Sequence, residues 1–224
     1  MQSPETNRVT ANARYTLEPN GDAVVTLEET ISGSSAGRIR GRFQDPTRRD
    51  AAIAQLLASQ HPGTELIEAG YENVDQIGRP VTIRASASMP RLAARSGNTL
   101  EIPTAFEPGL KLRQMAPLTS RKQPLIVTAR ELEENTDTYE LPAGATVSDL
   151  PAPVTLETPY ATYKRSFEVV APSAPGERPR IVARHLWRLD VGRIAPTDYP
   201  AFRGLLEGIA RAEGARIRVQ LPSP

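Results

Sequence analysis

The stretch at residues 196–221, PTDYPAFRGLLEGIARAEGARIRVQL, predicts a helix near 198–213 and then a strand. Large side chains recur there at spacings of three and four, which places them on one stripe of the helix: Tyr199, Phe202, Leu206 and Ile209. Gly214 ends the helix. Gly204 and Gly208 each cost it roughly 1 kcal/mol of propensity. Packing must therefore hold the helix, and we expect a β-sheet as its partner because the preceding sequence is largely strand-like.

Composition limits the possible functions. The 224 residues are enough to bury a core, and they contain no Cys, which excludes disulfides, thiolate metal sites and a cysteine nucleophile. The formal net charge of +1 provides no field that would attract nucleic acid. No apolar run is long enough to cross a bilayer, and the first residues, MQSPETNRV, carry no visible export signal. We therefore expect neither a nucleic-acid partner nor a membrane span.

The first half of the chain predicts a β-sandwich-like domain at residues 8–115. Residues 13–31 form two β-prone runs around Pro-Asn-Gly-Asp, which indicates a hairpin. Strands are also expected at 65–71 and 80–89, and Asp-Pro opens a helix near 46–60. The Arg-rich run at 38–42 is interpreted as an edge strand with Arg on its solvent face, in preference to a nucleic-acid-binding arm.

The second half predicts another such domain at residues 116–224, with its helix near 198–213. A strong strand is expected at 125–132. An acidic cluster follows it and is interpreted as a solvated turn: Glu131, Glu133, Glu134 and Asp137. Residues 181–191 form a strand whose inner side carries Ile181, Ala183, His185, Trp187 and Leu189. The predicted fold is thus mainly β, with two antiparallel halves and one packed helix in each.

The search for catalytic motifs predicts no catalytic, cofactor-binding or metal-binding residue. The chain has no Gly-rich phosphate loop, HExxH, paired CxxC or GxSxG. His61 precedes Pro-Gly at a helix end and is interpreted as a capping or solvated imidazole. His185 is interpreted as a structural histidine with satisfied hydrogen bonds near the rim of the sheet, beside a buried Trp187. A non-enzymatic protein is therefore expected.

Several motifs in the second half carry a family resemblance through their order. They are YELPAG at 139–144, VSDLP at 147–151, TPYATY at 158–163, IVARHLWRL at 181–189 and IAPTDYPAFRGLLEGI at 194–209. This series resembles the C-terminal uncharacterised module of bacterial transglutaminase-like proteins. The earlier PNGDAVVTLEETISGSSAGRIRGRF at 19–43 is similar to the segment after their papain-like core, which extends the resemblance over residues 10–221.

The resemblance implies a three-part protein whose catalysis comes from a Cys-His-Asp triad in the papain-like core. That Cys is missing here, so no catalytic residue carries over. It also implies an exported protein of the bacterial periplasm or cell surface. The function expected from it is that of a non-catalytic accessory module that positions such a core or docks a protein partner along exposed strands.

Two alternatives stay open. A carbohydrate- or peptide-binding sandwich would need an exposed aromatic platform that includes Tyr71, Tyr160 or Tyr163. A carboxylate-dependent hydrolase, around residues 131–137 or 65–72, would need two acids ~5–10 Å apart in a cleft, with a raised pKa. The accessory-module hypothesis assumes no hollow equipped for chemistry. A deep pocket with converging acids beneath the last helix would count against it.

Overall fold

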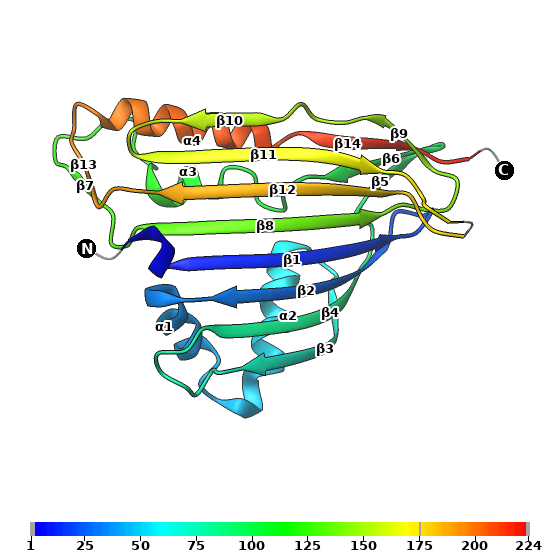
Figure 1. Ribbon diagram of the computed structural model, residues 1–224, viewed down its shortest axis with the longest axis horizontal. Coiled ribbons are helices and arrows are strands. Elements are labelled where there is room, and N and C mark those ends of the chain that lie inside the picture. Colours follow the sequence, from blue (N-terminus) through cyan, green and yellow to red (C-terminus); the bar gives the residue numbers. More distant parts are fainter. Residues whose placement is uncertain (1–2, 175, 223–224) are drawn as a thin grey trace.

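The computed structural model describes residues 3–174 and 176–222, and it confirms the mainly β fold. Eight strands form one sheet, in the order β10-β11-β12-β8-β1-β2-β4-β3 (Figure 1). Their bounds are β1 (Arg8–Leu17), β2 (Ala23–Ile31), β3 (Glu65–Glu72), β4 (Val81–Met89), β8 (Glu131–Glu140), β10 (Val154–Glu157), β11 (Ala161–Val170) and β12 (Arg180–Leu189).

The sheet consists of two antiparallel halves joined edge to edge. Strands β1, β2, β4 and β3 pair antiparallel in the first half, as do β8, β12, β11 and β10 in the second. The halves meet where β1 runs parallel to β8. Separate β-sandwich-like units are predicted, whereas this pairing merges their strands into one layer and leaves neither β1 nor β8 as an open edge. A domain boundary near residue 115 stays a prediction.

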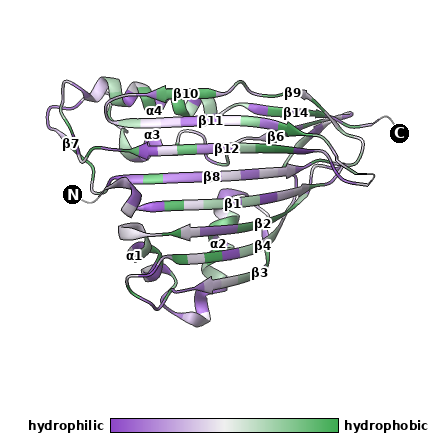
Figure 2. Cartoon of the chain, in the orientation of Figure 1, coloured by the Kyte–Doolittle hydropathy of each residue, from purple (hydrophilic) through white to green (hydrophobic). Residues whose placement is uncertain are grey.

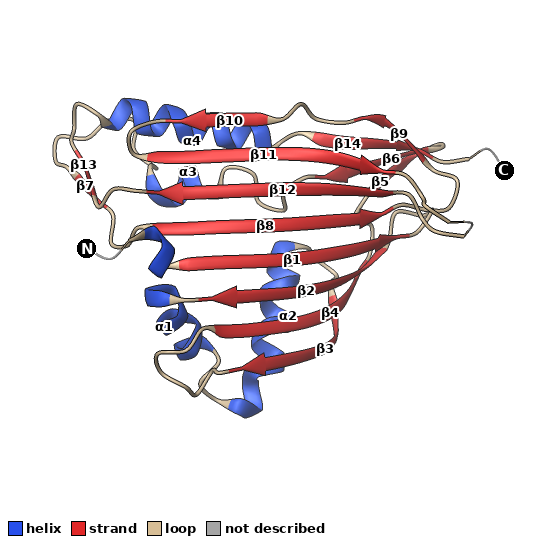
Figure 3. Cartoon of the chain, viewed as in Figure 1, coloured by secondary structure: helices blue, strands red, loops and turns tan. Residues whose placement is uncertain are grey.

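All the helices and a smaller sheet lie on one face of the large sheet (Figure 3). The helices are α1 (Gly33–Arg42), α2 (Arg49–Gln60), α3 (Leu110–Met115) and α4 (Tyr199–Glu213), with short 3-10 turns η1 (Pro4–Thr6) and η2 (Pro46–Arg48). The smaller sheet contains β5 (Ala94–Ser96), β6 (Thr99–Pro103), β14 (Arg216–Gln220) and β9 (Thr146–Asp149), and a separate pair is β7 (Leu125–Ile126) with β13 (Arg193–Ile194). We call the covered face the inner face and the opposite one the outer face.

Period-two alternation separates the two faces of each long strand. On β1, Tyr15 and Leu17 are buried on the inner face, whereas Asn12 and Arg14 are exposed on the outer face. Figure 2 shows the resulting bands of opposite hydropathy along the strands. Successive side chains of a strand point to opposite sides of the sheet, so this pattern fixes which residues can meet the helices.

Helix α4 packs as predicted. Tyr199, Phe202 and Leu206 are fully buried and Ile209 is 1% exposed. They form one apolar cluster with Trp187 of β12 and with inner-face residues of β11. The helix is therefore held by burial of its aromatic stripe, which offsets the two interior glycines.

The hairpin β1–β2 and the helix near 46–60 are also confirmed. Gly21 in the hairpin turn has φ +94°, and a Cβ there would lie 2.2 Å from the Ala93 carbonyl oxygen, so the position requires glycine. Asp45 accepts a hydrogen bond from the Thr47 backbone N–H, and η2 leads directly into α2. Turn and cap chemistry thus set both elements locally.

Two predicted strands are wrong. The Arg-rich run at 38–42 lies in α1, because the side-chain oxygen of Asn7 accepts hydrogen bonds from the Ser34 N–H (2.8 Å) and hydroxyl (3.0 Å) and caps the helix. Ala36 and Ile39, three residues apart, then face the core. The strand expected at 125–132 is interrupted: Leu125–Ile126 forms β7 and pairs with β13, and residues 131 and 132 are the start of β8.

Replacing Phe202 with alanine is expected to lower the free energy of unfolding by about 3–5 kcal/mol, because the ring is fully buried. The thermal midpoint should fall by roughly 10 °C. Gly204→Ala is the matched change on the same helix. A Cβ there meets nothing within 4 Å, so the free energy of unfolding of this variant should rise by about 1 kcal/mol. Circular dichroism melts of both variants measure this, and an unchanged midpoint for Phe202→Ala would contradict the packing.

Candidate functional site

The acidic cluster at residues 131–137 lies on the central strand β8, so the prediction of a solvated turn is wrong. Strands β1 and β12 flank β8 and bind its backbone on both edges. Alternation then turns Glu131, Glu133 and Asp137 to the inner face, while Glu134 lies on the outer face 2.5 Å from Arg8. Polar residues are thereby forced beneath the helices.

A row of polar side chains crosses the middle of the inner face. The registers place Arg165 of β11 opposite His185 of β12, His185 opposite Asn135 of β8, and Asn135 opposite Ala11 of β1. Glu29 of β2 follows on the other side of Ala11. The row therefore combines a cation, an imidazole, an amide and a carboxylate on four strands.

A cavity of about 300 Å³ lies over this row. Its floor consists of small side chains on β1, β4 and β12: Ala11, Ala13, Ala85 and Ala183. Leu57 and Gln60 of α2, residues 103–106 after β6, and Glu213 at the end of α4 close over it. Alanine at the centre of the sheet thus leaves space that the covering layer does not fill.

One side of the cavity is aromatic. The rings of Tyr15 and Tyr139 stack with centroids 5.0 Å apart, and Phe106 lies 6.2 Å from Tyr15. His61 occupies the C-cap position of α2 through its backbone N–H, which donates to the Leu57 carbonyl oxygen, whereas its imidazole neither caps the helix nor lies free in solvent. Its Nε2 donates to the Pro90 carbonyl oxygen (2.7 Å), and its ring meets Phe106 edge-on. This contact helps to hold Phe106 over the cavity.

The carboxyl groups of the cavity have raised pKa values. Burial raises the pKa of Asp137 to about 6, although the charge of Arg165 acts in the opposite direction. Burial, followed by repulsion from Glu133, raises the pKa of Glu29. Burial also raises the pKa of Glu213. These side chains are therefore poorly solvated acids in one enclosure.

His185 lies in the middle of the inner face, and its Nε2 has no hydrogen-bond partner among the described residues. The prediction of a satisfied histidine near the rim is therefore wrong, although its placement on the core side is confirmed. Burial, with the positive charges of Lys111 and Arg165, lowers the pKa of His185 to about 3. The imidazole is thus neutral across the physiological range.

Arg165 joins three parts of the fold. It is 7% exposed, and its guanidinium donates to the carbonyl oxygens of Thr104 and, at 3.5 Å, of Ala212. It also lies 5.2 Å from the centroid of the Phe167 ring. Its hydrogen bonds thereby tie β11 to the segment after β6 and to the end of α4.

The acids at residues 131–137 have different partners. Glu131 accepts a hydrogen bond from the Trp187 indole N–H (2.8 Å), and Glu133 pairs with Lys111 (2.7 Å). Only Asp137 of this set lines the cavity. Glu29 on β2 lies two strands away from Asp137 on β8 and is offset from it by two residues along the strands. The Cα atoms of Glu29 and Asp137 are therefore separated by roughly 12 Å. Their carboxyls approach each other only if both side chains lean across the alanine floor.

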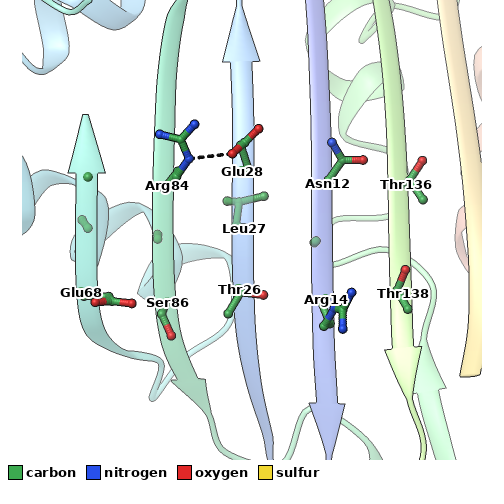
Figure 4. A pocket seen from close by; sticks show the side chains of 14 residues that line it. Asn12, Arg14, Thr26, Leu27, Glu28, Glu68, Arg84, Ser86, Thr136 and Thr138 are labelled. Carbon is green, nitrogen blue, oxygen red and sulfur yellow. Dashed lines mark hydrogen bonds and ion pairs between the residues drawn. The ribbon is translucent and has the colours of Figure 1, made fainter. Parts of the chain in front are cut away.

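The outer face carries a shallow groove of about 680 Å³ over β3, β4, β2, β1 and β8. Figure 4 shows its short polar side chains, with Asn12 level with Thr136 and Arg14 level with Thr138. Arg84 binds Glu28 (2.6 Å) and also Glu72. The acids predicted at 65–72 thus lie on the edge strand β3, away from the inner cavity.

The aromatic platform proposed for a carbohydrate-binding protein is not formed. Tyr163 is fully buried beneath α4. Tyr71 lies on the edge strand β3, where its hydroxyl donates to Asp50 (3.1 Å). Tyr160 precedes β11, close to the opposite edge of the sheet. The three rings therefore share no surface.

No role is predicted from the sequence for Glu29, Asn135 or Arg165. A signal for Arg165 exists, because it stands between Tyr163 and Phe167 at period two in a strand, where an inner position is expected. Across residues 3–174 and 176–222, no three or more His, Asp or Glu residues are grouped to hold a metal ion. None of the helices in these ranges is long and apolar enough to cross a membrane.

Fold and site together define a mainly β protein with a mixed eight-stranded sheet that is covered on one face. Residues 98–219, more than half of the chain, match a family described as a domain of unknown function with solved-structure structure (DUF3858). The protein belongs to this family. The predicted relationship to an uncharacterised module is thus confirmed at this level.

Other comparisons add little. No curated protein matches the chain. A crystal structure of a Parabacteroides distasonis ATCC 8503 protein, described as a "putative protease", is similar at 14% identity with a TM-score of 0.38. The match covers 46% of this chain and 19% of that one, so it spans about a fifth of that protein's length. Similarity this distant supports no conclusion about function.

Asp137→Asn is expected to stabilise the protein at neutral pH. The native pKa lies above the unfolded value, so the carboxyl's contribution to stability is lost as the pH rises through about 6. Above that pH, wild type carries a penalty of about 3 kcal/mol that the amide lacks. At pH 4, close to the unfolded pKa, this penalty should shrink to about 0.5 kcal/mol.

Urea unfolding of both proteins between pH 4 and 8 measures this gap. His185 acts in the opposite sense, because its lowered pKa removes stability as the pH falls below 6.5. Both proteins contain His185, so its contribution drops out when the free energy of unfolding of wild type is subtracted from that of the variant. Asp149→Asn, at an exposed carboxylate, is the control and should change stability by less than about 0.5 kcal/mol. A less stable Asp137→Asn protein at pH 7.5 would contradict the burial argument.

Proposed function

We propose that this chain is a non-catalytic interaction module that docks a protein partner on the outer face of its large sheet. The partner we propose is a transglutaminase-like core, in the periplasm or at the cell surface of a bacterium. The observation that carries the docking role is the uncovered outer face: all helices and the smaller sheet pack on the opposite side (Figures 1 and 3).

The size of the outer face suits a protein rather than a small molecule. Eight strands span about 34 Å across the sheet, and strands of ten residues span about 33 Å along it. The resulting area of about 1,000 Å² exceeds the ~800 Å² that each partner buries in a typical stable complex. A single face can therefore supply a complete interface.

The chemistry of the outer face favours a polar, charge-matched interface. Its main groove adjoins a second one of about 420 Å³, and Thr136 lines both. Ion pairs lie across the surface, such as Arg14 with Glu140 and Arg184 with Glu168. Alternating charges of this kind favour one partner orientation and disfavour mismatched surfaces.

The transglutaminase association and the exported location rest on the motif series in residues 139–209 described above. Membership of the DUF3858 family supports a module of uncharacterised role and leaves the partner open. The accessory role follows if the catalytic cysteine is supplied by another domain.

A carboxylate-dependent hydrolase is the second candidate, and one observation favours it. Asp137 has a pKa raised to about 6, which suits a general acid, and Glu29 lines the same cavity. We rank this function second because the registers place the Cα atoms of these acids roughly 12 Å apart, so their carboxyls reach the catalytic separation of about 5–10 Å only if both side chains lean toward each other.

Arg84→Glu is expected to weaken binding of a bacterial papain-like transglutaminase core at least tenfold, about 1.4 kcal/mol. The change reverses the charge between Glu28 and Glu72 at the groove. Arg211→Glu, on the exposed side of α4 in the opposite layer, is the control and should bind as wild type. Isothermal titration calorimetry of the separately expressed core gives the affinities. Equal affinity of wild type and Arg84→Glu would rule out the groove, and absence of any binding would rule out this partner.

A further inference from the structure

Three polar atoms in the inner cavity lack hydrogen-bond partners among the described residues: Asn135 Oδ1, Tyr163 Oη and His185 Nε2. Tyr163 is fully buried. A buried polar group without a partner destabilises a protein. Three such groups around one cavity therefore indicate that something else completes their hydrogen bonds.

The charge balance of the cavity indicates the sign of the missing group. Three carboxyls line it, those of Glu29, Asp137 and Glu213, against the single guanidinium of Arg165. That guanidinium is already bonded to backbone carbonyls. Lys111, the other nearby cation, is paired with Glu133 at 2.7 Å. The cavity thus has an excess of acceptors and negative charge, which a cation would complement.

The remaining lining is apolar and aromatic. Leu57, Met89 and the alanine floor offer hydrocarbon contact, and Tyr15 and Phe106 present rings within the same space. Aromatic rings attract ammonium groups through their electron-rich faces. A volume of about 300 Å³ lies at the small end of ligand sites. A compact organic cation fits this combination better than a bare metal ion does, since the described residues form no metal-ligand cluster.

We propose that the inner cavity binds a small primary ammonium compound. Its ammonium group is held by Asp137 and the Asn135 side-chain oxygen, Glu29 adds negative charge from across the alanine floor, and its short apolar tail lies against Tyr15 and Phe106. Glu29 also lines a wider groove of about 550 Å³ beside α1 and α3, which provides a route from solvent. This site lies on the opposite side of the sheet from the proposed docking face and does not depend on it.

The test uses n-butylammonium chloride with the full chain, in which alanine methyl groups carry carbon-13. Titration should shift the methyl signals of Ala11, Ala13 and Ala85, with a dissociation constant in the millimolar range. Ala201, exposed on α4, should not shift. Two probes of similar size serve as controls: n-butanol, without charge, should bind at least tenfold more weakly, and butyrate should not bind.

Variants separate the carboxylate from the cavity itself. Asp137→Asn should weaken n-butylammonium binding at least tenfold, and Tyr163→Phe about threefold, because the ring stays while the unpaired hydroxyl is lost. Asp149→Asn, at an exposed carboxylate, should bind as wild type. Circular dichroism of each variant confirms that it is folded.

Four outcomes would overturn the proposal. Equal affinity for n-butanol would mean an apolar hole, and preference for butyrate would mean an anion site at Arg165. Unchanged affinity in Asp137→Asn would remove the carboxylate from recognition. No shift of the cavity methyls at several tens of millimolar would mean a closed, hydrated void. None of these results bears on docking at the outer face, so failure of one proposal is distinguishable from failure of the other.

Discussion

The parallel pairing of β1 with β8 is the constraint on which the rest of the structure depends. It joins two antiparallel halves into one sheet and places β8 at the centre, with a neighbour on each edge. Alternation then forces the acids of β8 beneath the helices, where burial raises the pKa of Asp137. The same pairing sets Ala11 and Ala13 beside them and opens the cavity. One strand contact therefore determines both the sheet and its polar interior.

The inner face shows how a sheet tolerates charge in its core. Glu131 is stabilised by the Trp187 indole and Glu133 by Lys111, so these carboxyls have local partners. Among the described residues, only the charge of Arg165 offsets the burial of Asp137. Carboxyls with and without a close partner in the described ranges thus lie on the same strand. Natural proteins tend to retain such unfavourable groups at functional sites, where stability is given up for binding or chemistry.

Local signals in the sequence account for the elements that were predicted. The spacing of Phe202 and Leu206 defines α4, and Asn20-Gly21 defines the hairpin, because turn and stripe chemistry act over a few residues. Contacts between distant residues explain the misses. Asn7 caps α1 from 27 residues away, and β8 is a strand only because β1 and β12 flank it. The buried acids stand at every second position before Tyr139, which is the spacing of one face of a strand. The polar composition of this segment obscured that pattern.

The two proposed surfaces use the same strands from opposite sides. On β1, Asn12 and Arg14 point into the outer groove, whereas the alternating residues Ala11 and Ala13 form part of the cavity floor on the inner face. Coupling between such sites would require an element with two discrete arrangements that both ligands bias. The central strands are fixed by continuous ladders on both edges, which leaves little freedom for a second arrangement. Within residues 3–174 and 176–222, Arg165 is the side chain of the large sheet that donates a hydrogen bond to the covering residues 103–106. Any response to a ligand should therefore arise in that covering segment, and the outer face should keep its shape.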